Sequence, residues 1–326
     1  MKVLSLFDGI SCARVALERA GKTVDHYYAS EIDKYAIQIS QKNWPEIIQL
    51  GGVKELIIKD GMVCNSEICG TYTFELDLLI GGSPCQDLSI AKKDRKGLDG
   101  ERSGLFWEYV RILNEVKPKY FILENVNSMP KEAKDLITKT LGVEPIMMNA
   151  ALVSAQNRKR LFWTNIPNVV LPEDKGILLK DILEEEVEEK FISSAESIKN
   201  NWRIEKAIKS PNEKSKALTA TMWKGAGNDG MTTIRIGSLN KGGQGDRIYS
   251  PDGKSVNLSA NGGGRGAKTG LYEIKGDIRK LTPIECERLQ SLPDNYTDGV
   301  SNTQRYKCLG NAFNVDVVTH ILSFIK

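Results

Sequence analysis

The sequence predicts an α/β fold: a doubly wound, mostly parallel sheet accompanied by a smaller, β-rich part. Three observations support this prediction. Over the first 165 residues, short apolar runs alternate with amphipathic helical patterns, which is typical of βαβ units. Beyond Pro172 the chain becomes rich in Gly, Thr, Ser and Asn, with short β-type segments. From Leu281 onward it returns to helical patterning.

The elements of the predicted large sheet follow in chain order. Its strands are short apolar runs, expected at residues 3–7, 25–32, 76–82, 119–126 and 161–166. Helical patterns lie between several of them, at residues 11–21, 33–44 and 105–116. Gly21 ends the first of these helices and Pro45 stops the second, as such residues commonly do. Strands that alternate with helices are joined by crossovers and therefore run parallel.

The later part of the chain predicts a different architecture. Residues 232–237 and 270–274 have strand character, and residues 217–234 align with 257–274 without a gap at an offset of 40. Two copies are too few for a solenoid, so we interpret them as paired loops of a small β-rich domain. An amphipathic helix is expected at 281–290, and residues 310–325 are also helical in pattern.

Composition indicates a soluble enzyme. The 326 residues are 40% hydrophobic and 27% charged. No apolar run reaches the roughly 18 residues that a membrane helix needs, and the N-terminus does not resemble a signal peptide. We therefore expect a cytoplasmic protein without membrane association. The six cysteines match no disulfide framework and only two histidines are present, so reduced thiols and no metal site are expected.

Charge is unevenly distributed along the chain. The net charge is only +3, but residues 171–200 carry four Lys and Arg against nine Asp and Glu. Residues 201–280 carry fifteen basic against seven acidic residues. The acidic stretch LEEEVEEK is typical of a solvated helical face. The basic, glycine-rich segment that follows is a candidate surface for a nucleic-acid backbone.

The segment LFDGISCA places a glycine turn between the first strand and the first helix. In open α/β sheets such a turn lets a ligand approach the backbone, and Glu31 ends the second strand, where it can accept from ribose hydroxyls. This pair indicates a cofactor that contains a nucleoside. The dinucleotide pattern GxGxxG is absent, which disfavours NAD; an ordinary strand-to-helix turn remains the alternative.

The segment GGSPCQDLS presents a cysteine where the third apolar strand ends. Pro84 stops any helix, so Cys85 should project into the cleft at the carboxyl edge of the sheet. Glu124 stands near the end of the next strand, within ENV. A thiol and a carboxyl group at neighbouring strand ends suit covalent catalysis. A buried structural cysteine is the alternative interpretation.

Taken together, these motifs resemble those of C5-specific DNA cytosine methyltransferases of bacterial and phage type, over nearly the whole chain. The resemblance rests on LFDGISCA, ASEID, GGSPCQDLS, RSGLFWEYVRIL, ENV, QNRKR, LTPIECERLQSLP and GNAF, in that order. It implies a Rossmann-like methyltransferase sheet and S-adenosyl-L-methionine as cofactor. It also implies a catalytic and cofactor-binding domain at 1–166, a target-recognition domain at 167–280, and C-terminal helices at 281–326 that return to the catalytic domain.

The resemblance assigns the chemistry to five residues. Cys85 would add to carbon C6 of a cytosine flipped out of duplex DNA, which raises electron density on C5. Glu124 would hold N3 and the exocyclic amine, and Asn125 would position that strand end. Arg160 and Arg158 would supply positive charge near O2 or the thiol.

The cofactor pocket implied by the resemblance draws on most of the early motifs. Its residues would be Phe7, Asp8, Gly9, Ile10, Ser11, Glu31, Ile32, Val53, Pro84, Leu105, Asn311 and Ala312. Two departures stand out. The family usually has an acid that contacts the adenine amine where this chain has Gly52, and a valine where it has Phe313.

The resemblance also implies double-stranded DNA as partner, a monomeric enzyme, and a cognate restriction endonuclease acting separately. Residues expected to contact DNA are Gln86, Ser89, Arg102, Lys224, Arg247, Arg265 and Lys268. Two alternatives are carried alongside: methylation of cytosine in transfer RNA, and a non-catalytic relative that only binds DNA.

Overall fold

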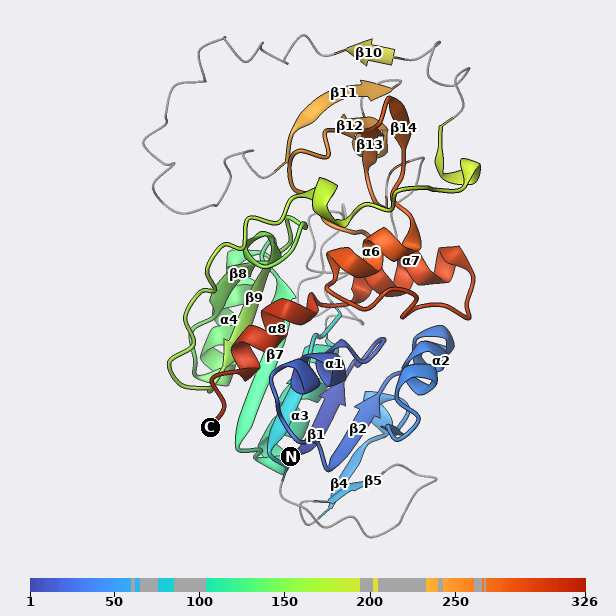
Figure 1. Ribbon diagram of the computed structural model, residues 1–326. Coiled ribbons are helices and arrows are strands. Elements are labelled where there is room, and N and C mark those ends of the chain that lie inside the picture. The colour runs from blue at the N-terminus through green and yellow to red at the C-terminus, as the bar shows by residue number, and fades with distance from the viewer. Residues whose placement is uncertain are drawn as a thin grey trace.

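The computed structural model describes residues 1–59, 62–64, 76–84, 104–193, 202–204, 233–239, 243–260, 266 and 268–326. They form a large α/β part and a smaller sheet beside it (Figure 1). The large part begins with β1 (Lys2–Leu6), α1 (Cys12–Arg19), β2 (His26–Ser30), α2 (Lys34–Asn43), β3 (Ile48–Gln49), the 3₁₀ turn η1 (Val53–Glu55), β4 (Ile57–Lys59) and β5 (Met62–Cys64). It continues with β6 (Leu78–Gly81), α3 (Leu105–Val116), β7 (Tyr120–Val126), α4 (Lys131–Leu141), β8 (Ile146–Asn149), η3 (Ala150–Leu152) and β9 (Lys159–Thr164).

The central sheet has seven strands in the order β3-β2-β1-β6-β7-β9-β8. The strands from β3 to β7 are parallel to one another. In this register Leu6, at the end of β1, lies opposite Ser30 of β2 and Gly81 of β6. The carboxyl ends of β1, β2, β6 and β7 therefore meet at one edge, where ligands bind in open α/β sheets. The predicted α/β fold with a mostly parallel sheet is confirmed.

One strand runs against the others. β9, expected from the sequence at residues 161–166, is antiparallel to β7 and to β8. It follows β8 after the short connection of residues 150–158, which contains only a 3₁₀ turn. A connection without a crossover helix joins antiparallel strands, and β9 inserts between β7 and β8. Sequence reasoning did not identify β8 itself.

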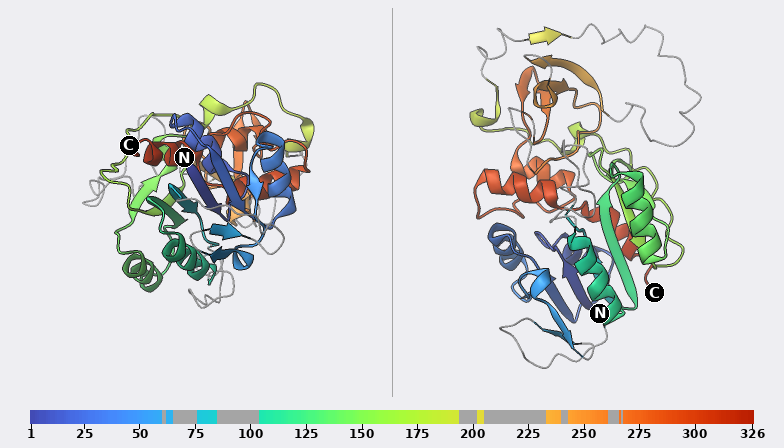
Figure 2. Two further views of the ribbon diagram at one scale, coloured as in Figure 1. Left: turned by 90° about the horizontal axis from the view of Figure 1, so that it is seen from below. Right: turned by 180° about the vertical axis from the view of Figure 1, so that it is seen from behind.

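Helices cover both faces of this sheet (Figures 1 and 2). On one face, Val3 and Ile80 pack with residues of α1, α2 and α8 (Val315–Leu322). On the other, Leu4 and Leu79 pack with residues of α3 and α4. Adjacent strand residues point to opposite faces, which explains why buried strands of this kind are apolar throughout.

The smaller sheet has five strands in the order β10-β11-β12-β13-β14. These are β10 (Trp202–Ile204), β11 (Arg235–Leu239), β12 (Arg247–Tyr249), β13 (Leu271–Ile274) and β14 (Asp277–Arg279), with 3₁₀ turns η4 (Leu179–Ile182), η5 (Glu189–Phe191) and η7 (Gln244–Asp246). β11 and β13 fall at the two strands predicted for this region. The first copy of the sequence repeat lies outside the described residues up to residue 232, so the domain boundaries stay a prediction.

The end of the chain lies beside its beginning. After α6 (Pro283–Leu289) and α7 (Asn302–Asn311), α8 packs against α1. Arg19 of α1 forms an ion pair with Asp316 of α8 at 2.8 Å, and the Lys22 ammonium donates to the Ile325 carbonyl oxygen at 2.5 Å. The sequence motif GNAF is thereby brought to the sheet edge that carries the first strand–helix turn.

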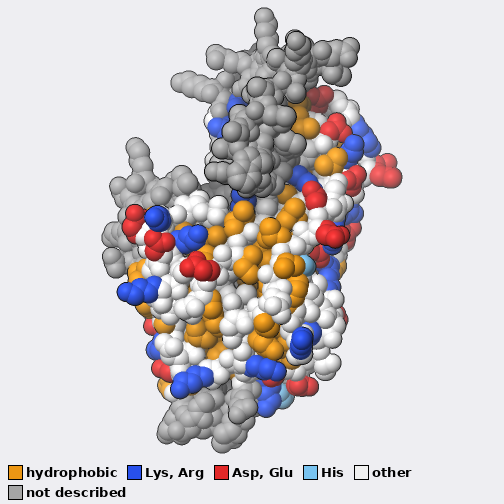
Figure 3. Space-filling model, turned by 90° about the vertical axis from the view of Figure 1, so that its left-hand side faces the viewer, with side chains coloured by type: hydrophobic (Ala, Val, Ile, Leu, Met, Phe, Trp, Pro, Cys, Tyr) orange, Lys and Arg blue, Asp and Glu red, His pale blue; other side chains and the backbone are white. Residues whose placement is uncertain are grey.

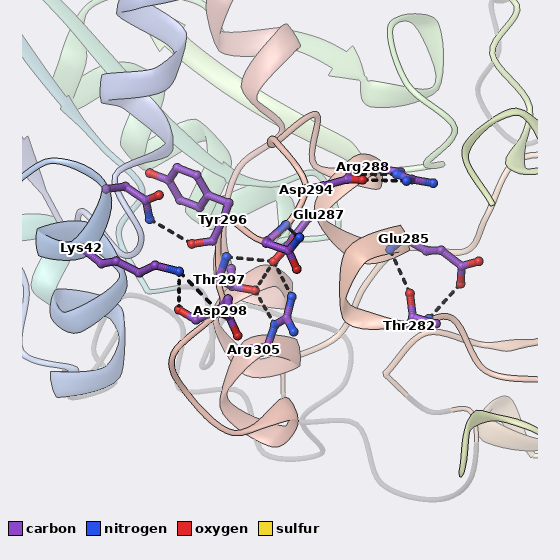
Figure 4. A network of polar contacts seen from close by, with 12 residues as sticks. Lys42, Thr282, Glu285, Glu287, Arg288, Asp294, Tyr296, Thr297, Asp298 and Arg305 are labelled. Atoms are coloured by element: carbon purple, nitrogen blue, oxygen red, sulfur yellow. Dashed lines mark hydrogen bonds and ion pairs between the residues drawn. The ribbon is translucent and has the colours of Figure 1, made fainter. Parts of the chain in front are cut away.

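Helix α6 carries two glutamates with no solvent exposure. The Glu285 carboxylate accepts two hydrogen bonds from the Arg279 guanidinium, at 2.7 and 2.8 Å. The Glu287 carboxylate accepts from the amide nitrogens of Asn295 and Thr297 and from Arg305 (Figure 4). Buried charges persist only when they are paired and hydrogen-bonded. These two networks therefore fix β14, the loop between α6 and α7, and α7 itself in one arrangement around α6.

The strand β8 forms an edge of the large sheet. Figure 3 views the molecule from that side, and hydrophobic side chains lie across the middle of the face with charged ones toward its margins. Among the described residues, no helix is long and apolar enough to cross a membrane.

Candidate active site

A cavity of about 470 Å³ opens at the carboxyl edge of the large sheet. Its walls come from the ends of β1, β2, β6 and β7, from η1 and the start of α3, and from the end of α7. All residues that were expected to hold the cofactor line it, except Ser11. Those that do are Phe7, Asp8, Gly9, Ile10, Glu31, Ile32, Val53, Pro84, Leu105, Asn311 and Ala312.

The turn between β1 and α1 has an unusual backbone. Phe7, Gly9 and Ser11 all adopt positive φ, at 57°, 62° and 59°. Only glycine takes this conformation without steric cost, and non-glycine residues there are uncommon and often lie at functional sites. The turn is fixed by Glu31, whose carboxylate accepts from the amide of Gly9 at 2.8 Å. The same carboxylate accepts from the amides of Ile32 and Asp33 at 2.8 and 2.9 Å.

Asp8 lies beneath this turn with its carboxyl group buried. It accepts hydrogen bonds from the Ser11 hydroxyl at 2.5 Å and from the Tyr27 hydroxyl at 2.7 Å. Burial raises the pKa of the Asp8 carboxyl from 3.8 to about 6. Ser11 itself has no exposed surface and also bonds to Ser40 at 2.6 Å. This explains why Ser11 supports the turn from behind while its neighbours line the cavity.

Glu124 and Arg160 form an ion pair at the opposite side of the cavity. Val126 of β7 lies directly opposite Arg160 of β9, so Glu124, two residues earlier, is a diagonal neighbour of Arg160 on the same face of the sheet. Nε of Arg160 lies 2.8 Å from Oε1 of Glu124, and the two side chains are only 14% and 13% exposed. The guanidinium therefore fixes the direction of a carboxylate that is mostly shielded from solvent.

Two glycines at the end of β6 permit close approaches of different kinds. A Cβ at Gly81 would lie 2.7 Å from the carbonyl oxygen of Leu6, which is incompatible with the β1–β6 pairing. A Cβ at Gly82 would lie 3.0 Å from Oε2 of Glu124. Gly81 thus allows β6 to pair closely with β1, and Gly82 leaves room for the Glu124 carboxylate.

Asn125 holds the segment that follows β6. Its side-chain amide donates to the carbonyl oxygen of Ser83 at 3.2 Å and to the Ser83 hydroxyl at 3.1 Å. Its own carbonyl oxygen accepts from the amide of Val126 at 2.8 Å. Asn125 is 1% exposed and does not line the cavity. Ser83 and Pro84 directly precede Cys85, which lies outside the described residues.

Arg158 joins three distant segments. One guanidinium nitrogen donates to the side chain of Asn257 at 2.8 Å, and another donates to the carbonyl oxygens of Ala312 and Gly310 at 2.7 and 3.3 Å. Arg158 is 4% exposed. The end of α7 also packs tightly here, because a Cβ at Gly310 would overlap with the backbone of Ser259 and Ala260. Arg158 lines the cavity, and these contacts are those of a positioning residue.

The C-terminal segment also supports the turn at Gly9. The Tyr296 hydroxyl donates to the carbonyl oxygen of Ile10 at 2.8 Å. The Lys307 ammonium pairs with the Asp33 carboxylate at 2.7 Å. These contacts connect α7 and its preceding loop to the start of both α1 and α2.

Several lining residues were missed by sequence reasoning. They are Cys12, Ser30, Asp33, Ala36, Lys54, Gly82, Ser83, Val126, Cys308 and Gly310. Most are neighbours of predicted residues, so adjacency to a motif was the available signal. Cys308 lies one helical turn before Asn311, so the motif GNAF pointed to this end of α7 but not to the cysteine itself. Phe313, noted as a departure, lines it too.

Of the residues expected to contact DNA, two are described. Arg247 begins β12, and Lys268 lies three residues before β13; both are partly exposed. The others lie outside the described residues: Gln86, Ser89, Arg102, Lys224 and Arg265. Within the described part of the chain, no cluster of three or more His, Cys, Asp or Glu side chains could hold a metal ion.

Comparisons with known proteins agree on one family. The family model of C-5 cytosine-specific DNA methylases matches residues 1–326. The type II methyltransferase M.HhaI of Haemophilus parahaemolyticus is 31% identical, covering 98% of this chain and 93% of that protein. The type II methyltransferase M1.ScrFI of Lactococcus lactis subsp. cremoris is 28% identical, covering 97% of this chain and 76% of that protein.

Two solved structures share the fold. The Dnmt2 methyltransferase of S. pombe aligns with a TM-score of 0.64 at 18% identity, covering 99% of this chain and 97% of that one. The methyltransferase EhMeth of Entamoeba histolytica aligns with a TM-score of 0.68 at 17% identity, with coverage of 99% and 97%.

Proposed function

Because the chain belongs to the family of C-5 cytosine-specific DNA methylases, we propose that it transfers a methyl group from S-adenosylmethionine to carbon C5 of a cytosine flipped out of duplex DNA. The observation that carries this proposal is the ion-paired Glu124–Arg160 on one side of a cavity whose other side presents Glu31 and an apolar surface.

The cavity suits the cofactor that this family uses. Its volume of about 470 Å³ falls within the range of roughly 300–1,000 Å³ typical of small-molecule sites. Ile32, Val53, Pro84 and Leu105 offer apolar surface for a purine, while the Glu31 carboxylate retains acceptor capacity for ribose hydroxyls. The bound cofactor would supply an electrophilic methyl group next to the reacting base.

Glu124 would recognise and activate the cytosine. Its carboxyl group can hold N3 and the exocyclic amine of the base, stabilising the state in which the ring has lost its aromaticity. Arg160 keeps that carboxylate oriented through the 2.8 Å contact. Such preorganisation is effective in a site from which water is largely excluded.

Cys85 would be the nucleophile. Its thiolate adds to carbon C6, which places an electron pair on C5 for methyl transfer. Loss of the C5 proton and elimination of the Cys85 thiolate then restore the ring and free the enzyme. Asn125, bonded to Ser83, would act on this step as a positioning residue for the chain that leads to Cys85.

The smaller sheet and its loops would recognise the DNA sequence. We place this target-recognition domain within residues 167–280, with the catalytic domain formed by 1–166 and completed by the helices of 281–326. Arg247, Lys268 and the basic residues of the intervening loops would contact phosphates or base edges. Arg158, which bonds to both Asn257 and the end of α7, would couple this domain to the cavity.

The test is methyl transfer with labelled cofactor to duplex DNA and, separately, to transfer RNA. We expect incorporation into DNA by the wild type, loss of turnover in Cys85→Ala, and a covalent adduct when 5-fluorocytosine replaces the target base. Cys64→Ala, which removes a different thiol, serves as the matched control and should retain activity. Methylation of transfer RNA alone would favour the RNA alternative, whereas DNA binding without any methyl transfer would favour a non-catalytic relative.

A further inference from the structure

The Phe313 side chain borders the part of the cavity in which Glu124 lies. It lines the cavity and is only 8% exposed. A Cβ at Gly82 would lie 3.8 Å from Cε1 of Phe313 and 3.0 Å from Oε2 of Glu124. The edge of the ring and the carboxylate are therefore both neighbours of Gly82. A smaller side chain at position 313 would leave part of this space open.

The backbone on both sides of Phe313 is anchored. The carbonyl oxygen of the preceding residue, Ala312, accepts from the Arg158 guanidinium at 2.7 Å. The following residue, Asn314, is the N-cap of α8, and its side chain accepts from the amide of Val317 at 3.1 Å. Because these anchoring residues are buried, the ring cannot move away from the cavity with its backbone unless hydrogen bonds are broken.

A second, much smaller cavity lies behind the ring. Its volume is about 10 Å³, close to the minimum that one water molecule requires. Its lining residues are Met148, Ala150, Arg158, Arg160, Phe162, Phe313, Asn314 and Val317. Three of them, Phe313, Arg158 and Arg160, also line the large cavity, so they form the partition between the two spaces. Removing the outer atoms of the ring would open this partition.

The reacting group of the cofactor would lie near this partition. In the proposed function the nucleoside lies against Glu31 and Ile32 and the base lies against Glu124, so the sulfonium and the group that it carries lie between them. Gly82 offers no spare room there, because even a Cβ would come within 3.0 Å of the Glu124 carboxylate. The size of the side chain at position 313 therefore changes the space that is open to the transferred group.

We propose that Phe313 is a specificity-determining residue of the active site, which limits the group carried by the sulfonium to the size of a methyl group. The inference rests on the proposed function, since it takes the cavity to hold a sulfonium cofactor. A second carbon on the sulfur would overlap with the ring edge, and close-packed interiors resist the insertion of even one methylene group. Valine at this position would remove the obstacle, because the space behind it continues into the small cavity.

The test compares the binding of S-adenosylmethionine and S-adenosylethionine, which carries one more carbon on the sulfur, by calorimetry. We expect the wild type to bind the methyl compound roughly tenfold more tightly, the effect of one methylene group that a pocket cannot accommodate. Phe313→Val should reduce this preference to about twofold while the affinity for S-adenosylmethionine changes little. Phe324→Val removes the same atoms from a ring that lines neither cavity and should keep the wild-type preference.

A second measurement follows the transferred group into the product. Plasmid DNA is incubated with each compound, and its nucleosides are analysed by mass spectrometry for 5-ethylcytosine and 5-methylcytosine. Phe313→Val should raise the ratio of ethyl to methyl product by roughly tenfold. Phe313→Leu should raise it by a smaller factor, and it keeps more of the buried volume if the valine variant fails to fold.

Two results would contradict the inference in different ways. Undiminished discrimination in the Phe313 variants, in binding and in transfer, would overturn the role of Phe313 while leaving the proposed function intact. A wild type that binds neither compound would overturn the cofactor assignment and this inference with it.

Discussion

Among single residues, Asp8 makes the stability of the turn at Gly9 depend on pH. It lies under the strained turn at Gly9, and burial raises the pKa of its carboxyl from 3.8 to about 6. Between these two values the folded protein binds a proton that the unfolded chain has released. The stability that Asp8 contributes is therefore complete below pH 3.8 and lost as the pH rises through 6.

This linkage predicts the behaviour of Asp8→Asn. The asparagine does not ionise, so the difference in unfolding free energy between variant and wild type should change by about 2.4 kcal/mol in favour of the variant from pH 4 to pH 7. Urea denaturation of both proteins at four pH values in this interval measures the difference. A difference that stays constant across the interval would show that Asp8 ionises normally in the fold.

Glu124 provides the second residue-scale prediction. Glu124→Gln keeps the shape of the side chain but cannot change its protonation state, so turnover should fall by roughly 10²-fold or more. Cofactor affinity, measured by calorimetry, should change little, because the base and not the cofactor would contact this group. An equal loss of cofactor affinity and turnover would point to a structural role for the Glu124–Arg160 pair.

At the scale of elements, helix α6 shows how buried charge organises its surroundings. Glu287 has no exposed surface and is satisfied by two backbone amides, the Thr297 hydroxyl and Arg305. The same helix carries Arg288, which pairs with Asp294 at 2.7 Å, but there the two side chains are 31% and 45% exposed. The chain thus offers a buried and an exposed ion pair on one element.

Removing one partner from each pair should have very different effects. Glu287→Ala leaves Arg305 and two amides without their acceptor, and should lower the unfolding free energy by about 3–5 kcal/mol. Asp294→Ala breaks an exposed pair and should cost about 1 kcal/mol or less. Chemical denaturation of the two variants gives this comparison directly. Similar losses of unfolding free energy in the two variants would mean that the residues around Glu287 rearrange to compensate for the missing carboxylate.

At the scale of the whole molecule, the two sheets have separate roles in the proposed function. The large sheet assembles the cavity from segments at both ends of the chain, and these would meet the same cofactor and cytosine whatever the surrounding sequence. The smaller sheet and its basic loops would meet the neighbouring base pairs. One good bidentate contact to a base contributes roughly 1–3 kcal/mol of discrimination.

This division predicts the outcome of a transplant. Residues of about 200 to 278, placed in a relative with another target, should carry the recognition sequence of this protein with them. Bisulfite sequencing of DNA from cells that express the chimera reads the methylated sites. Methylation that remains at the recipient's original sites would place recognition elsewhere in the chain.

The sequence by itself determined the order of the elements and the segments from which the cavity is built. Apolar runs, helical periodicity and turn residues act over a few neighbours, so most of the alternation up to the end of β7 at Val126 could be predicted directly. The motifs around Gly9, Glu31 and Pro84 follow the ends of predicted strands. In a parallel sheet such ends meet at one edge, which is why residues far apart in sequence could be predicted to share a site.

The tertiary structure decided what depends on contacts between distant segments. The antiparallel direction of β9 follows from its insertion between β7 and β8. Arg158, expected near the reacting base, bonds to Asn257, Gly310 and Ala312, and the Glu55 carboxylate fills the space beside Gly52. No local pattern encodes these pairings, because each is selected by burial and hydrogen bonding that exist only after the segments have packed together.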